Sequence, residues 1–255
     1  MGREIMSLPA PPADRRVPYG EHPSQFIDWR FPAEPGVRPI VVIIHGGFWR
    51  AQRDLLYAGH LCAALTAAGF VTANIEYRRV GEEGGGWPGT FHDVTAAFNA
   101  ARVQAGADGP GAIVVGHSAG GHLALLLASG QPGLTGAVAL APAACLLDAW
   151  EKGLGDGAVT EFLLGSPDEL PHIYELACPS RRQSSVPRVL IHGTADDIVP
   201  IGQSREYVRL RSHDPGPVLL LELPGTDHFD IIDPRSAVFA RVVSTVCDLA
   251  AGTIR

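Results

Sequence analysis

The sequence contains a single lysine, Lys152, although lysine and arginine together number 20 in its 255 residues. Schiff-base chemistry or phosphate binding by a P-loop would have to depend on that residue, and no GxxxxGK[ST] pattern surrounds it. Acidic residues number 27 and give a formal net charge of −7, so no basic excess points to a nucleic acid. The sequence therefore favours neither a lysine-based enzyme nor a nucleic-acid-binding protein.

Closely spaced cysteines and long apolar runs are also missing. The four cysteines are far apart and form no CxxC pair, which argues against a zinc site and a disulfide framework; they are Cys62, Cys145, Cys178 and Cys247. The segment Met1–Pro9 lacks the apolar core of a signal peptide, and no apolar run reaches the ~18 residues of a membrane span. We therefore expect a soluble, cytoplasmic protein with no membrane partner, metal or cofactor.

The chain is long and apolar enough for one α/β domain over residues 1–255. Residues 1–38 are rich in Pro, Gly and Arg and predict an N-terminal arm, with 26–30 as a candidate edge strand. Residues 142–186 mix Gly, Pro and Asp with short apolar clusters and predict a small helical, cap-like insertion.

Between and after these segments, strand and helix patterns alternate. The continuous β-branched run at 40–44 is typical of a parallel strand buried on both faces, and 112–115 predicts a short buried strand. Further strands are predicted at 70–77, 134–140, 188–191 and 218–223. Helical spacing predicts helices at 55–68, 91–105, 119–128, 201–211 and 237–250. Such repeated strand–helix units indicate an α/β fold with a mostly parallel sheet and helices on both faces.

The most informative motif is a GxSxG sequence centred on Ser118. It follows one predicted buried strand directly and precedes an apolar helix, which is the setting in which a sharp strand-to-helix turn exposes a nucleophilic serine. A side chain at Gly116 or Gly120 would clash within so tight a turn. The sequence thus predicts Ser118 as a catalytic nucleophile.

A serine nucleophile needs a base, and the base needs an orienting carboxylate. In this architecture both follow the serine along the chain, the acid before the histidine. His228 lies in the loop after the last predicted strand, so we predict it as the base. Asp196 and Asp197 both follow strand 188–191; we favour Asp196 as the acid and expect Asp197 to cap the helix near Pro200 or to bind the loop backbone.

Acyl transfer also needs hydrogen-bond donors for the oxyanion. The glycine-rich loop after strand 40–44 predicts backbone donors at Gly47 and Phe48, together with Ala119, the residue after the nucleophile. Trp49 and Trp87 are candidates for the substrate pocket, with burial in the core as the alternative. The remaining histidines near these motifs, at positions 45, 117, 122 and 192, are expected to have structural roles.

These motifs resemble the α/β-hydrolase superfamily over about residues 38–249. His45-Gly46-Gly47 resembles the oxyanion motif of hormone-sensitive-lipase-like esterases, and the following Phe48-Trp49 is similar to the arylformamidase (kynurenine formamidase) branch. The run from His192 to Asp197 resembles the acid loop of prolyl-oligopeptidase-type peptidases, in which the first aspartate is the triad acid; this supports Asp196. The resemblance implies an α/β-hydrolase fold.

We therefore expect a serine hydrolase that cleaves a small acyl ester or amide, of the carboxylesterase or arylformamidase type. Its expected partner is a small-molecule ester or amide, and its oligomeric state is left open, with a homodimer as one option. One alternative is a prolyl-oligopeptidase-like peptidase that lacks the propeller of that family, since a chain of this length has no room for a propeller. The other alternative is a non-catalytic ligand-binding protein with the hydrolase fold.

Overall fold

The structure is a computed structural model that describes residues 2–34, 36, 38–106, 109 and 111–254. The described residues form an eight-stranded sheet in the order β1-β2-β4-β3-β5-β6-β7-β8. The strands are β1 (Arg15–Pro18), β2 (Phe26–Arg30), β3 (Ile40–Ile44), β4 (Thr72–Ile75), β5 (Ala112–His117), β6 (Leu134–Leu140), β7 (Arg188–Gly193) and β8 (Val218–Leu223). The pairs β1–β2 and β2–β4 are antiparallel, and all other neighbouring pairs are parallel.

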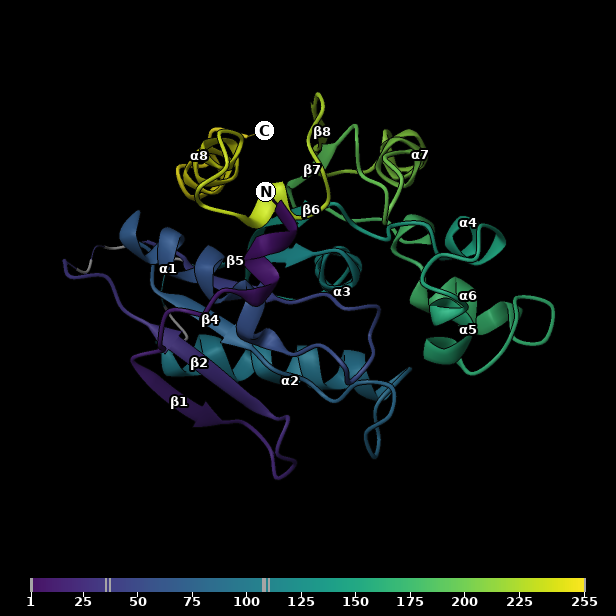
Figure 1. The fold of residues 1–255 in the computed structure, drawn as a ribbon, viewed down its shortest axis with the longest axis horizontal. Coiled ribbons are helices and arrows are strands. Elements are labelled where there is room, and N and C mark those ends of the chain that lie inside the picture. Colours follow the sequence, from purple (N-terminus) through teal and green to yellow (C-terminus); the bar gives the residue numbers. More distant parts are fainter. Residues whose placement is uncertain (1, 35, 37, 107–108, 110, 255) are drawn as a thin grey trace.

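Helices join and flank these strands (Figure 1). They are α1 (Gly59–Ala67), α2 (Gly89–Gln104), α3 (Ala119–Ala128), α4 (Leu146–Glu151), α5 (Ala158–Leu163), α6 (Pro171–Ala177), α7 (Gly202–Arg211) and α8 (Phe239–Ala250). Short 3-10 helices are η1 (Gly2–Ser7), η2 (Leu55–Ala58), η3 (Pro179–Arg181) and η4 (Asp230–Ile232). The predicted α/β fold with its mostly parallel sheet is confirmed, and β3, β6, β8 and α3 have the predicted bounds.

One expectation about the sheet is wrong. The predicted strand 26–30 forms as β2, but it is not the edge, because β1 pairs along its outer side. Strand β1 is four residues long and mostly exposed, so it carries no alternation of buried and exposed residues that its sequence could reveal. Pro18 is tolerated there because an edge strand needs fewer ladder donors than a central one.

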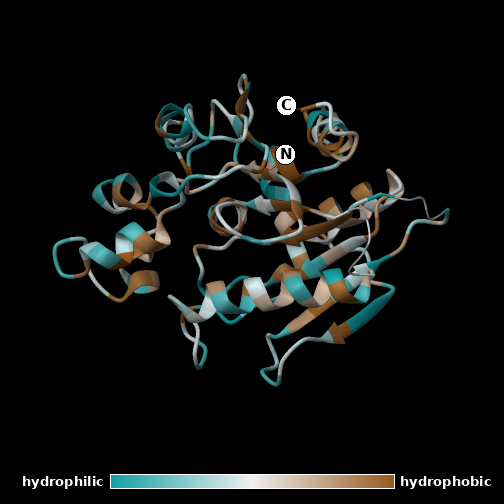
Figure 2. Cartoon of the chain, turned by 180° about the vertical axis from the view of Figure 1, so that it is seen from behind, coloured by the Kyte–Doolittle hydropathy of each residue, from teal (hydrophilic) through white to brown (hydrophobic). Residues whose placement is uncertain are grey.

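The alternation of side chains along β3 divides the core between the two faces of the sheet. Val42 and Ile44 belong to the cluster packed under α2 and α3, whereas Val41 and Ile43 belong to the cluster packed under α1 and α8. All five residues of β3 are buried, as expected of a central parallel strand covered on both faces. Figure 2 shows hydrophilic residues mixed with hydrophobic ones along α2, the helix with one face toward the sheet and one toward solvent.

The insertion forms three short helices, α4 to α6, which stand together at one end of the molecule (Figure 1). Leu146, Phe162 and Tyr174 from these helices are buried in the same core cluster as Trp49. Lys152 lies here too and pairs with Asp148 at 2.6 Å. The insertion is thus attached to the sheet through the loop that follows β3.

The turn between β5 and α3 is crowded by backbone on both sides. A Cβ atom on Gly116 would overlap the carbonyl oxygen of Gly120, and one on Gly120 would overlap the carbonyl oxygens of Ile44 and His45. The turn therefore lies directly against the carboxyl end of β3, and only residues without side chains fit there, as the sequence predicts.

We predict that Gly120→Ala lowers the free energy of unfolding by at least about 3 kcal/mol or prevents folding, because the clash is with backbone that cannot move aside. Gly130→Ala, at the other end of α3, is the matched control. Its Cβ would meet nothing within 4 Å, and we expect a change within about 0.5 kcal/mol. Urea denaturation of both variants measures the difference; equal stabilities would contradict the crowding of the turn.

Candidate active site

Ser118 occupies the turn between β5 and α3 in a backbone conformation that side chains rarely adopt. Its φ and ψ are 58° and −120°, and it stands at the N-cap of α3. Its backbone N–H donates to the carbonyl oxygen of Leu140 on the neighbouring strand at 2.8 Å, which holds the turn to the sheet. Such strain persists only where surrounding contacts enforce it, and it is a feature of nucleophile turns. Ser118 is 4% exposed, at the wall of a cavity.

Asp196 and His228 contact each other at the ends of two adjacent strands. Nδ1 of His228 lies 2.6 Å from Oδ2 of Asp196. The other carboxylate oxygen of Asp196 accepts hydrogen bonds from the N–H groups of Ile198 and Val199 at 2.9 and 2.8 Å. Burial alone would raise the pKa of Asp196, but hydrogen bonds from His192 and His228 outweigh it and hold the pKa well below its usual range. The carboxylate is therefore ionised and fixed in position.

The adjacent Asp197 points elsewhere. Its side chain is 63% exposed and pairs with Arg3 of η1 at 2.6 Å. We expected Asp197 to cap the helix near Pro200 or to bind the loop backbone, and this expectation is wrong. Asp196 instead accepts hydrogen bonds from the N–H groups of Ile198 and Val199 in this loop. Of the two aspartates, only Asp196 contacts His228.

A turn after β8 fixes the backbone around His228. Oδ1 of Asp227 accepts from the N–H groups of Phe229 and Asp230, each at 2.8 Å, so the loop folds around the aspartate side chain. His228 is 2% exposed and lines the same cavity as Ser118. Among the hydrogen bonds of the described residues, none joins Ser118 to His228; such bonds are often long in enzymes without substrate.

A chain of buried hydrogen bonds connects the His228 loop to the glycine loop after β3. The N–H of Gly46 donates to the Tyr57 hydroxyl, which lies 3.2 Å from Nδ1 of His117. On the other side of the ring, Nε2 of His117 donates to the carbonyl oxygen of His228 at 3.0 Å. Burial, with a smaller contribution from the nearby His228, lowers the pKa of His117 to about 3. A neutral ring with its proton on Nε2 satisfies both bonds, so His117 has the structural role that the sequence predicts.

The glycine loop after β3 is anchored by buried hydrogen bonds on one side, whereas several of its backbone N–H groups have no partner among the described residues. Gly47, Phe48 and Trp49 have φ values of 107°, 52° and 58°. Beneath them, Nε2 of the buried His45 lies 2.8 Å from the buried carboxylate of Glu76, which also accepts from the N–H of Leu55. None of the hydrogen bonds of the described residues uses the backbone N–H of Gly47, Phe48 or Ala119. Backbone N–H groups that are shielded from water normally have a hydrogen-bond partner. These three N–H groups can therefore donate to a bound ligand.

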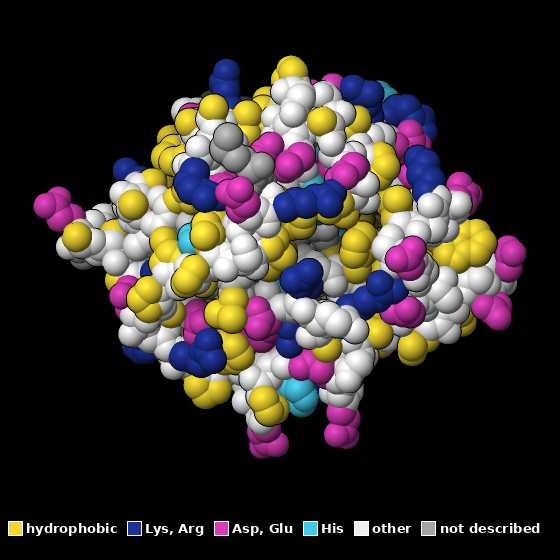
Figure 3. All heavy atoms as spheres, in the orientation of Figure 1, with side chains coloured by type: hydrophobic (Ala, Val, Ile, Leu, Met, Phe, Trp, Pro, Cys, Tyr) yellow, Lys and Arg dark blue, Asp and Glu magenta, His cyan; other side chains and the backbone are white. Residues whose placement is uncertain are grey.

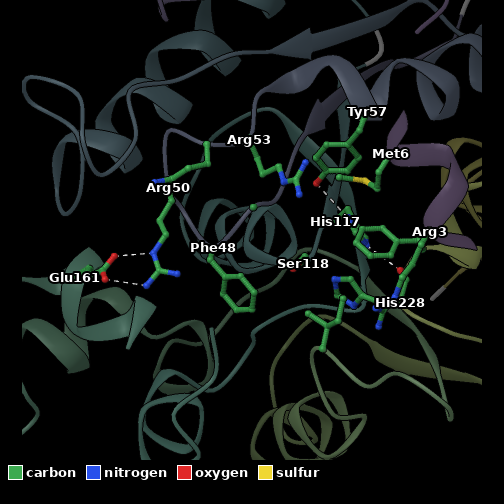
Figure 4. A pocket seen from close by; sticks show the side chains of 14 residues that line it. Arg3, Met6, Phe48, Arg50, Arg53, Tyr57, His117, Ser118, Glu161 and His228 are labelled. Carbon is green, nitrogen blue, oxygen red and sulfur yellow. Dashed lines mark hydrogen bonds and ion pairs between the residues drawn. The ribbon is translucent and has the colours of Figure 1, made fainter. Parts of the chain in front are cut away.

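Ser118 and His228 line a cavity of about 730 Å³ (Figure 4). Its wall is formed by residues of η1, of the loop after β3 with η2, of the β5–α3 turn, of α5 and of the loops after β7 and β8. The lining residues are Arg3, Met6, Gly47, Phe48, Arg50, Gln52, Arg53, Tyr57, His117, Ser118, Glu161, Ile198, His228 and Phe229. The sequence motifs do not reveal Arg3 and Met6; their only signal is the apolar Ile5 between them, which is buried beside η4.

Neither predicted pocket tryptophan lines this cavity. Trp49 is 1% exposed, and its ring stacks on Phe162 of the insertion at 4.6 Å between centroids. Trp87 stacks on Phe91 at 5.8 Å. Trp49 belongs to the buried core between the sheet and the insertion, which is the alternative that its sequence context left open, and Trp87 is partly buried and packs against the same cluster. The insertion contributes one lining residue, Glu161.

Within the described part of the chain, no group of three or more His, Cys, Asp or Glu side chains is arranged to hold a metal ion. None of the helices in this part of the chain is long and apolar enough to cross a membrane. Three of the four cysteines are buried and Cys247 is partly buried; all four are free.

The parallel sheet, the strained serine after β5 and the loops that follow β7 and β8 define the class: the chain has the α/β-hydrolase fold. Solved structures of esterases superpose on this fold. A truncated carbohydrate esterase from gut microbiota superposes with a TM-score of 0.78 at 20% identity and covers 94% of this chain and 99% of that one. Esterase B from Lactobacillus Rhamnosis (HN001) superposes with a TM-score of 0.79 at 19% identity and covers 99% of this chain and 91% of that one.

Sequence comparison finds one matching family and several similar esterases. The family described as BD-FAE matches residues 28–138. Esterase LipC of Mycobacterium tuberculosis (strain ATCC 25618 / H37Rv) is 31% identical over 247 residues, which cover 86% of this chain and 60% of that protein. The chain spans about 60% of the length of the curated relatives it matches. The chain has the α/β-hydrolase fold, and its sequence is similar to those of named esterases.

The neutral state of His117 predicts a pH dependence of stability. Because its pKa is about 3 in the folded protein and near 6.5 when unfolded, unfolding takes up a proton below about pH 6.5. The stabilising contribution is therefore complete above the unfolded pKa and is lost progressively as the pH falls from about 6.5 toward the folded pKa of about 3. His122, whose pKa burial lowers to about 4, contributes in the same direction.

In urea titrations between about pH 6.5 and about pH 4, we expect His117→Gln to reduce the pH slope of the unfolding free energy by about one bound proton. Unchanged slopes in the variant would show that His117 is charged in the folded protein.

Proposed function

We propose that this protein is a serine hydrolase that cleaves a small carboxylic ester through an acyl-enzyme. The observation that carries the proposal is the 2.6 Å contact between Asp196 and His228, with His228 and Ser118 on the wall of one cavity. This is the order of groups that nucleophilic catalysis by serine requires: acid, base, nucleophile. The names of the similar proteins, which are esterases, support an ester over other acyl substrates.

In the proposed reaction, Oγ of Ser118 attacks the ester carbonyl while Nε2 of His228 accepts the serine proton. The ionised Asp196, which binds Nδ1 of the ring, keeps Nε2 unprotonated before the attack and stabilises the imidazolium afterward. The imidazolium then gives its proton to the departing alcohol. Water, activated by the same histidine, attacks the acyl-enzyme and releases the acid.

The free N–H groups of Gly47, Phe48 and Ala119 are the proposed donors for the oxyanion. Their support is that no other group in the described chain uses them and that Gly47 and Phe48 line the cavity beside Ser118. A donor of this kind contributes about 2.7–4 kcal/mol to transition-state stabilisation. The apolar side chains of Met6, Phe48 and Ile198 suit the hydrocarbon part of a small ester.

The direct test is hydrolysis of p-nitrophenyl acetate and p-nitrophenyl butyrate. We expect turnover by the wild-type protein and a loss of about 10³-fold or more in kcat for Ser118→Ala, because the remaining groups can stabilise charge but cannot form the acyl-enzyme. Parallel assays with N-formylkynurenine separate an esterase from an arylformamidase. Full activity of the serine variant on both esters would contradict the assignment.

The adjacent aspartates provide a matched pair of variants. Asp196→Asn should lower kcat on p-nitrophenyl butyrate by about 10⁴-fold, because an amide cannot hold the required tautomer of His228. Asp197→Asn changes the same chemistry one residue away, at a side chain that is 63% exposed and makes no contact with His228, and should retain wild-type kcat. Thermal unfolding checks that both variants are folded. A larger loss in Asp197→Asn than in Asp196→Asn would reverse the choice of acid.

A further inference from the structure

The charge of the cavity is opposite in sign to that of the protein. The sequence has a net charge of −7, yet three arginines and a single acidic residue line the cavity: Arg3, Arg50 and Arg53 against Glu161. In the view of Figure 3, dark-blue basic side chains gather around the hollow near the middle of this face. Clefts lined by one sign of charge concentrate ligands of the opposite sign.

Two of the three arginines already have partners. Arg50 makes two hydrogen bonds to the carboxylate of Glu161, at 2.6 and 2.8 Å, and these fasten the loop after β3 to the insertion. Arg3 pairs with Asp197. The guanidinium of Arg53 makes no hydrogen bond or ion pair with any described residue, so its charge is available within the cavity.

Although Arg53 is exposed, its backbone and stem are held in place. The stem lies where the missing side chain of Gly47 would be, since a Cβ atom on Gly47 would overlap Cβ of Arg53. The carbonyl oxygen of Arg53 accepts a hydrogen bond from Arg79, a nearly buried side chain that is paired with Glu82. Arg53 is therefore packed directly on the loop whose N–H groups we assign to the oxyanion, and Figure 4 shows it extending toward the cavity from the same side as Tyr57.

We propose that Arg53 binds a carboxylate carried by the substrate, so that the preferred substrates are esters with a negatively charged group near the scissile bond. A planar guanidinium with two free N–H edges matches a carboxylate in geometry as well as in charge. Arg3 and Arg50, although paired, add to the positive potential along the same wall. This inference rests on the proposed esterase function and names the class of substrate for that site.

The carboxylate could be on the acyl or the alcohol side, so two matched pairs of esters test the proposal. For the alcohol side, 4-acetoxybenzoate is compared with the neutral 4-acetoxybenzamide. For the acyl side, the monophenyl ester of adipate is compared with its neutral methyl phenyl diester. We expect a higher kcat/KM for the anionic member of at least one pair, and a preference that falls as ionic strength rises.

The variants are Arg53→Gln, Arg53→Lys and a control, Arg209→Gln, at an exposed arginine of α7 outside the cavity. In Arg53→Gln the ratio of kcat/KM for the anionic ester to that for its neutral partner should fall by about 10-fold, mainly through KM. Arg53→Lys, which keeps the charge but loses the two-pronged geometry, should fall between Arg53→Gln and wild type. Arg209→Gln should keep the wild-type ratio.

The outcomes separate the two proposals. If the wild-type protein hydrolyses neutral esters through Ser118 but prefers neither anionic ester, the carboxylate site is wrong and the esterase proposal stands. An anionic preference that survives Arg53→Gln also overturns the site. If no ester of either kind is hydrolysed, the esterase proposal itself fails.

Discussion

The structure of the site depends on one close approach of backbone to backbone, between the β5–α3 turn and the carboxyl end of β3. Gly120 lies so near the carbonyl oxygens of Ile44 and His45 that no side chain fits between them. This contact holds the turn that contains the strained Ser118 beside the loop that begins at Gly46. The candidate nucleophile and the free N–H groups of Gly47 and Phe48 are therefore neighbours because of a packing constraint that involves no charge.

Polar contacts then align the remaining groups with that turn. The hydrogen bonds from Gly46 through Tyr57 and His117 to the carbonyl of His228 link three loops from different strands. Asp196 orients the same histidine from the other side. Because all of these groups are buried, each unpaired atom would be costly, so the network favours one arrangement of the loops. A site built in this way is formed before a substrate arrives.

Much of this arrangement follows from local sequence patterns. Ser118 comes directly after β5, and Asp196 and His228 lie in the loops after β7 and β8. Because the carboxyl ends of parallel strands meet at one edge of the sheet, the pattern of strands brings the three regions together. The choice between Asp196 and Asp197 is less apparent from the sequence, because it depends on which side chain reaches the N–H groups of Ile198 and Val199.

Other features depend on contacts between distant segments, for which the sequence carries little signal. Arg3 and Met6 reach the cavity because Ile5 packs beside η4, more than 200 residues along the chain. Trp49 follows the glycine loop after β3 but turns into the core, where Phe162 of the insertion provides a stacking partner. Arg53 has no motif at all; its significance comes from its position against Gly47 and from the absence of a partner among the described residues.

If Ser118 is an activated nucleophile, a reagent specific for such serines labels it in the folded protein. The folded protein is treated with a fluorophosphonate probe, digested, and mapped by mass spectrometry, with urea-unfolded protein as the control. We expect one adduct per chain, on Ser118, formed only in the folded state. An unlabelled folded protein, or an adduct on a different serine, would contradict it.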